Sequence, residues 1–103
     1  MKTKVELADQ VLDFLRHLAP GPRKAMRTGL HDLEKGHGDL KALEGDLAGY
    51  WRLRVSKYRV VFSYATRGGH RIAECVYGAE RSIVYEVFSE QLRQQLIQRG
   101  RKP

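Results

Sequence analysis

The sequence is poor in the residues that build metal centres and disulfide frameworks. It holds a single cysteine, Cys75, which excludes an internal disulfide and any site made of several cysteines. Its four histidines follow no ligand spacing such as His-x-x-x-His, so we expect neither a metal nor another cofactor. Cys75 lies in the mostly apolar run 72–77, where a small buried side chain is favoured over a reactive thiol.

Long apolar runs are also missing. No stretch approaches the roughly 18 apolar residues that span a bilayer, and the basic start of the chain lacks the apolar core and cleavage site of a secretory signal. These absences predict a soluble, cytoplasmic protein without a membrane partner. Because the 103 residues contain no repeat and no linker, we expect a single domain over residues 1–103.

Positive charge is abundant. The chain has 19 Lys and Arg against 12 Asp and Glu, which gives a net charge of +7 and a pI near 9.9. Such a charge fits a polyanionic partner, but solubility alone also explains it, so the positions of the cations must separate the two interpretations.

The first third of the chain has the spacing of two helices. A short strand is predicted over 2–7, and Asp9 can cap a first helix whose apolar residues recur at helical spacing up to the Pro-Gly-Pro turn at 20–22. A second helix is predicted over 22–36, with a glycine stop. We expect the two helices to pack as an antiparallel hairpin, followed by a surface connection over 36–49.

After residue 50 the pattern changes to a period of two. Apolar and polar side chains alternate over 51–55 and 58–64, which predicts two strands, and a Gly-Gly turn signal leads to a third strand over 71–78. Residues 83–88 fit a strand or a helix equally well, and a last helix is predicted over 89–100. The predicted fold class is α+β: an N-terminal helical hairpin packed on one face of a small antiparallel sheet, with a C-terminal helix.

A two-residue turn at Ser56-Lys57 decides which side chains of the first hairpin share a face. With that turn, position 54 pairs with 59 and position 52 with 61, so Arg52, Arg54 and Arg59 lie on one face. The opposite face is apolar and is expected to receive the helices.

A turn at 68–69 sets the register of the third strand in the same way. It places position 62 opposite Cys75 and position 60 opposite Tyr77, so both side chains are expected on the apolar face.

The same register sets Arg59 opposite Gly78 and brings Arg81 back toward the other arginines. Like charges directly opposite each other, as at 54 and 59, cost some tenths of a kcal/mol unless an anion lies between them, and arginine forks suit a phosphate. A solvated sheet face with scattered arginines is the alternative interpretation. The cations between Tyr50 and Arg81 are Arg52, Arg54, Lys57, Arg59, Arg67, Arg71 and Arg81.

Residues 43–62, LEGDLAGYWRLRVSKYRVVF, resemble the hallmark of the RelE/ParE toxin superfamily, L-x-G-x-x-x-G-x-x-R-x-R-V-G-x-Y-R-V-x-aromatic. Ser56 stands where these toxins commonly have the turn glycine. Residues 81–85, RSIVY, are similar to the closing R-x-x-V-Y element of the family. The resemblance covers nearly the whole chain and implies the same α+β fold.

The resemblance also implies a function and a set of site residues. The RelE-like branch cuts messenger RNA in the ribosomal A site without a metal, the ParE-like branch inhibits DNA gyrase, and a cognate antitoxin holds the toxin inactive. Further contacts to nucleic acid are expected from Lys57, Arg67 and Arg71. By position, the catalytic residues correspond to Arg52, Arg54, Arg59, Arg81 and Tyr85.

The residue types suit that chemistry. Attack by a neighbouring 2′-hydroxyl needs a base, stabilisation of a charged phosphorane and protonation of the leaving oxygen. Arginines suit the second task, since one preorganised contact is worth on the order of 3 kcal/mol of barrier. Neighbouring cations lower a tyrosine pKa from about 10, so we assign Tyr85 the acid/base role; a buried Tyr85 that only hydrogen-bonds the backbone is the alternative.

Three functional hypotheses follow. The favoured one is a ribosome-dependent endoribonuclease toxin whose partners are an antitoxin, the ribosome and messenger RNA. The second is a DNA gyrase inhibitor without catalytic activity of its own, in which charge reversal at Arg52 leaves toxicity intact. The third is an inactive relative or a plain nucleic-acid-binding module, which binds RNA with steep salt dependence and does not stop growth.

Overall fold

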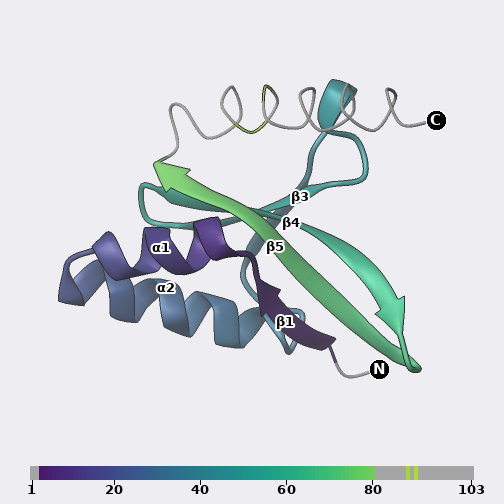
Figure 1. Cartoon of the computed structure of the whole chain (residues 1–103), viewed down its shortest axis with the longest axis horizontal. Helices are drawn as coiled ribbons and strands as arrows, with labels where there is room; N and C mark the ends of the chain where they lie inside the picture. The colour runs from purple at the N-terminus through teal and green to yellow at the C-terminus, as the bar shows by residue number, and fades with distance from the viewer. Residues whose placement is uncertain (1–2, 81–87, 89, 91–103) are drawn as a thin grey trace.

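Two helices lie on one face of a five-stranded sheet (Figure 1), and the computed structural model describes residues 3–80, 88 and 90. The strand order is β1-β5-β4-β3-β2; β1 runs parallel to β5, and the other neighbours are antiparallel. In chain order the elements are β1 (Thr3–Leu7), α1 (Asp9–His17), α2 (Pro20–Leu33), β2 (Asp39–Ala42), the 3-10 turn η1 (Gly45–Leu47), β3 (Trp51–Val55), β4 (Tyr58–Arg67) and β5 (His70–Glu80).

The helical hairpin is confirmed, and α2 begins at Pro20 rather than near Pro22. Prolines are tolerated in a first helical turn because the backbone N–H groups there have no helical partner. Arg23 of α2 ties the two helices together, because its guanidinium donates hydrogen bonds to the carbonyl oxygens of Leu15, Arg16 and Leu18, at 3.2, 3.0 and 2.9 Å. These carbonyls lie at the end of α1, where helical acceptor bonds run out, and only that of Leu15 also accepts a backbone bond, from the N–H of Leu18 at 3.2 Å.

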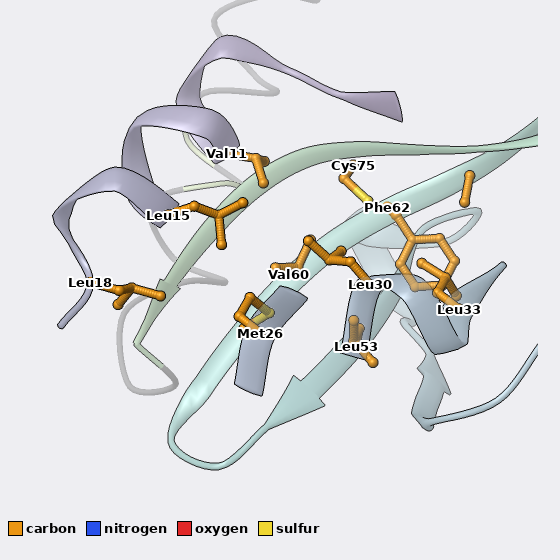
Figure 2. Close-up of a cluster of buried hydrophobic side chains, with 11 residues drawn as sticks. Val11, Leu15, Leu18, Met26, Leu30, Leu33, Leu53, Val60, Phe62 and Cys75 are labelled. Carbon is orange, nitrogen blue, oxygen red and sulfur yellow. The ribbon is translucent and has the colours of Figure 1, made fainter. Parts of the chain in front are cut away.

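The main core fills the space between the helices and the sheet (Figure 2). Apolar side chains of both helices meet those of β3, β4 and β5, and Val11, Met26, Leu33, Val60 and Phe62 are wholly buried. The sequence predicted this contact correctly, from the helical spacing of the apolar residues in the helices and from their alternation in the strands.

The β3–β4 hairpin has the predicted register. Arg52 pairs with Val61 and Arg54 with Arg59, around a turn at Ser56-Lys57. Ser56 adopts a left-handed backbone with φ of 56°, which a glycine accepts without strain and a serine does not.

The predicted register of β4 with β5 holds only up to Phe62, which pairs with Cys75 as expected. An irregularity between Val61 and Phe62 then shifts the pairing, so that Val61 lies opposite Tyr77 and Val60 opposite Gly78. The expected pairing of position 60 with Tyr77 is therefore wrong.

This β-bulge sends Tyr77 to the other face of the sheet. There it joins a second apolar cluster with Leu47, Val61 and Phe88, instead of the core beneath the helices. Arg59 accordingly lies opposite Ala79 rather than Gly78.

The predicted surface connection over 36–49 is wrong as well, since it contains β2 and η1. Leu40 packs against the main core, and Leu47 is buried in the second cluster. Burial of these two apolar side chains stabilises the ordered conformation of the segment. β2 forms the edge of the sheet beside β3.

The third predicted strand is longer than expected, because β5 covers His70–Glu80 and forms a long hairpin with β4. Arg81, Tyr85 and most of the predicted helix over 89–100 lie outside the described residues. Phe88 and Glu90 are both helical. Within the described part of the chain, no helix has the length and apolar character that crossing a membrane requires.

Candidate functional site

Among the described residues, four cationic side chains of β2, β3 and the start of β4 gather on the sheet face that points away from α1 and α2, and this part of the face is here called the arginine face. Strand alternation and register place Arg52, Arg54 and Arg59 on it, together with Lys41 of β2, which lies opposite Arg52. The predicted convergence of these three arginines on one face is confirmed by the backbone pairing.

An acidic residue lies among these cations. Arg52 donates a hydrogen bond from Nη1 to Oδ1 of Asp39 at 3.0 Å, and Nε of Arg54 lies 3.9 Å from Oδ2 of the same carboxylate. Asp39 also lies directly opposite Arg54 in the β2–β3 register. The electrostatic cost of facing Arg54 with Arg59 is thus offset within the protein itself.

The arginines differ in how far a ligand can reach them. The Arg54 side chain is 51% exposed, whereas that of Arg52 is 14% exposed. Arg59 is buried at 8%, and its Nη1 donates to the carbonyl oxygens of Ser56 and Tyr58, both at 3.0 Å. Arg59 therefore braces the turn, and Arg54 is the most accessible of the three.

Lys57 lies at the hairpin turn and is held on one side. Its Nζ is 3.4 Å from Oε1 of Glu80 and 5.5 Å from the centre of the Tyr58 ring. It stands at the same end of the sheet as the arginines, with a carboxylate already beside it.

The other two predicted nucleic-acid contacts, one on β4 and one on β5, lie at the far end of the β4–β5 hairpin, whose first strand of ten residues is roughly 30 Å long. Arg67 is paired with Glu6 and with Glu74, and this pairing, chiefly the Glu6 hydrogen bond, raises its pKa. Arg71 donates to Oγ1 of Thr3 at 3.0 Å and lies 4.5 Å over the Tyr64 ring. Neither joins the arginine face cluster.

Two members of the face were missed from the sequence because β2 was missed. Asp39 and Lys41 fall on the same side of that strand through the alternation Asp39-Leu40-Lys41-Ala42, which was the available signal. Lys41 and Arg52 also border a pocket of about 250 Å³. Arg81 and Tyr85, the remaining expected catalytic residues, lie outside the described residues.

Cys75 has the structural role that the sequence favoured. Its side chain is 1% exposed within the main core, and burial raises the pKa of the thiol to about 12. A thiol held in this form is a poor nucleophile near neutral pH.

Solved structures of toxin–antitoxin proteins are similar to this chain. A chain of the RelBE2 toxin–antitoxin complex from Mycobacterium tuberculosis superposes with a TM-score of 0.66 at 20% identity, over 79% of this chain and 100% of that one. The YoeB/ParE toxin from Agrobacterium tumefaciens gives a TM-score of 0.62 at 20% identity, over 76% and 98%. A chain of the archaeal RelE–RelB complex from Pyrococcus horikoshii gives 0.60 at 22% identity, over 80% and 98%.

No family model matches the sequence, and no curated protein matches it. The structural matches cover almost the full length of the chains they involve. The fold is therefore that of RelE/ParE-like toxins, as the sequence resemblance implied.

Proposed function

We propose that this chain is the toxin of a type II toxin–antitoxin pair and acts as a ribosome-dependent endoribonuclease that cuts messenger RNA in the A site. The observation that carries the proposal is the gathering of Lys41, Arg52, Arg54 and Arg59 on one sheet face. That face belongs to a fold shared with RelE and YoeB/ParE proteins. A phosphodiester chain is the ligand class that such a surface suits best.

The arginines divide the work according to their exposure. Arg54 meets the scissile phosphate first, because half of its side chain is exposed. Arg52 follows by exchanging the Asp39 carboxylate for a phosphate oxygen, since both are anionic acceptors for the same guanidinium. Arg59 stabilises the turn of the hairpin that carries Arg52 and Arg54, and its buried guanidinium adds positive charge behind them.

The RNA itself supplies both the nucleophile and the leaving group of the reaction, and the protein supplies proton transfer and charge stabilisation. The 2′-oxygen forms a bond to phosphorus, the bond to the 5′-oxygen breaks, and a 2′,3′-cyclic phosphate results. One proton leaves the 2′-hydroxyl and another reaches the departing 5′-oxygen. We assign Arg81 to the charged phosphorane and Tyr85 to proton transfer, on the strength of the sequence resemblance, while Arg52 and Arg54 stabilise the added charge.

The antitoxin is proposed to act by covering the arginine face. An acidic segment would supply several carboxylates where Asp39 supplies one, and so would compete directly with RNA. The toxin–antitoxin complexes among the similar structures support a partner of this kind.

Primer extension on a defined messenger RNA in purified 70S ribosomes tests the activity. We expect wild-type protein to cut within A-site codons, and Arg54→Ala, Arg81→Ala and Tyr85→Phe to lose most of this cleavage. Arg27→Ala is the matched control, because Arg27 is an exposed residue of α2, on the other side of the sheet from the arginine face. Absence of cleavage by folded, antitoxin-free wild-type protein would sink the ribonuclease proposal.

DNA gyrase inhibition is the second candidate. It is favoured by the internal neutralisation of Arg52 by Asp39, which weakens the face as a phosphate site, and by the YoeB/ParE toxin among the similar structures. A supercoiling assay distinguishes it. Inhibition that survives Arg52→Glu would establish a binding toxin without chemistry of its own.

A further inference from the structure

A pocket of about 550 Å³ lies between α1 and the end of β5, on the side of the sheet away from the arginine face. It is lined by residues of α1, of the start of β4 and of the last part of β5, among them Asp13, Phe14, Tyr58, Gly78 and Glu80. Ligand sites in proteins commonly have volumes of roughly 300–1,000 Å³. The proposed nuclease site does not use this pocket.

One wall of the pocket is the end of β5, where no strand among the described residues lies beside its outer edge. β1 accompanies β5 only as far as the pair Leu7 and Cys75. Beyond it, the amide of Gln10 takes the place of a strand at Gly78, accepting from its N–H at 2.7 Å and donating to its carbonyl oxygen at 2.8 Å.

Glu80 continues this edge. Alternate residues of a strand turn their backbone N–H and C=O groups to the same side, so those of Glu80 point the same way as those of Gly78. Among the described residues, no strand pairs with Glu80 on that side. A free strand edge is a ready template for an extended peptide.

The other walls suit a cationic side chain. Phe14 and Tyr58 meet edge to face with ring centres 5.9 Å apart, and Asp13 and Glu80 place two exposed carboxylates at the rim. Lys57 already binds Glu80 and lies over the Tyr58 ring, which shows that these groups accept an ammonium.

We propose that this pocket binds an extended segment of a partner protein, which pairs with the free edge of β5 at Glu80 and places a lysine or arginine between Asp13, Tyr58 and Glu80. Among the described residues, the other titratable side chains here are Tyr77, which also lines the pocket, His17, beside Asp13, and Lys57, beside Glu80. A nucleic-acid strand is a poorer occupant, because its phosphates would face both carboxylates. The arginine face stays uncovered while this segment is bound.

Titration of the uniformly ¹⁵N-labelled full chain with two peptides tests the proposal. The probes are the capped pentapeptide Thr-Val-Arg-Val-Thr and its counterpart with glutamate in place of arginine. We expect the arginine peptide to shift the amide signals of Asp13, Gly78 and Glu80 in a saturable way at millimolar concentration, and the glutamate peptide to leave them unmoved.

Two variants keep the outcome decisive. Asp13→Asn with Glu80→Gln neutralises both exposed carboxylates and is expected to weaken the arginine peptide about fivefold or more. Glu44→Gln, which removes one carboxylate at an exposed position that does not line this pocket, is expected to leave its affinity unchanged. Equal binding of both peptides, shifts confined to the arginine face, or no shifts at all would overturn the proposal. The proposal would also be overturned if raising the protein concentration, or adding an oligonucleotide instead of the peptide, shifted the same amide signals.

Discussion

Asp39 and Arg52 come from neighbouring strands and are joined by a hydrogen bond of 3.0 Å on the arginine face. The same carboxylate approaches Arg54. Asp39 therefore occupies the position between two guanidinium groups that a phosphate would take, and any polyanion must compete with it.

The first prediction concerns this carboxylate. Asp39→Asn keeps an oxygen acceptor for Arg52 but removes the negative charge, so single-stranded RNA is expected to bind several-fold more tightly at low salt. The plot of log affinity against log salt becomes steeper by about 0.7 for each additional phosphate that the protein neutralises. Fluorescence anisotropy across a salt series measures both the affinity and this slope.

Asp13→Asn is the control for that measurement, because it removes one exposed carboxylate from α1 on the other side of the sheet. An equal increase in affinity in the two variants would mean that only net charge matters, and the specific competition by Asp39 would be wrong. The result does not depend on whether the protein cleaves RNA.

Gly78 gives the second prediction. A Cβ there would lie 2.6 Å from Cδ2 of Phe14, so Gly78→Ala forces the ring away from the strand and lowers the free energy of unfolding by about 1–3 kcal/mol. Urea denaturation followed by circular dichroism measures the change. Gly21→Ala meets no atom within 4 Å and lies in the first turn of α2, so it is expected to be neutral or slightly stabilising.

The third prediction concerns the strained backbone at Ser56. Its φ of 56° lies in the left-handed region, where a side chain costs roughly 1 kcal/mol. Ser56→Gly is expected to stabilise the protein by about 0.5–1 kcal/mol by the same urea assay, and Ser56→Ala, which keeps the Cβ, is not. Destabilisation by glycine would mean that the serine side chain does more for the turn than its strained backbone costs.

The sequence predicted what depends on local repetition. Helical spacing located α1 and α2, alternation located β3 to β5, and the turn at Ser56-Lys57 gave the register that aligns Arg54 with Arg59. Each of these features is set by residues close together in the chain, so periodicity reveals them.

What was missed depends on contacts between distant segments. The alternation over the four residues of β2 is too short to predict a strand by itself, and the strand exists because Leu40 packs against the core and the backbone of β2 pairs with β3. The β-bulge in the β4–β5 pair falls in the run Cys75-Val76-Tyr77, whose uniform apolar character does not show which face each side chain takes. Asp39 was missed together with β2, and with it the internal counter-charge of the site.

Cys75 gives the last prediction, a dependence of stability on pH. Burial raises its pKa to about 12 in the folded chain, against an ordinary value of 9.0. The folded thiol therefore keeps its proton while the unfolded one releases it, so the stability associated with this group is complete below pH 9 and falls as the pH rises from 9 toward 12. Cys75→Ala removes the titration, so the difference in unfolding free energy between wild type and variant is expected to shrink across that range. A difference that stays constant with pH would show that the thiol is reached by water in the folded protein, and rapid labelling by a thiol reagent at pH 8 under native conditions would show the same.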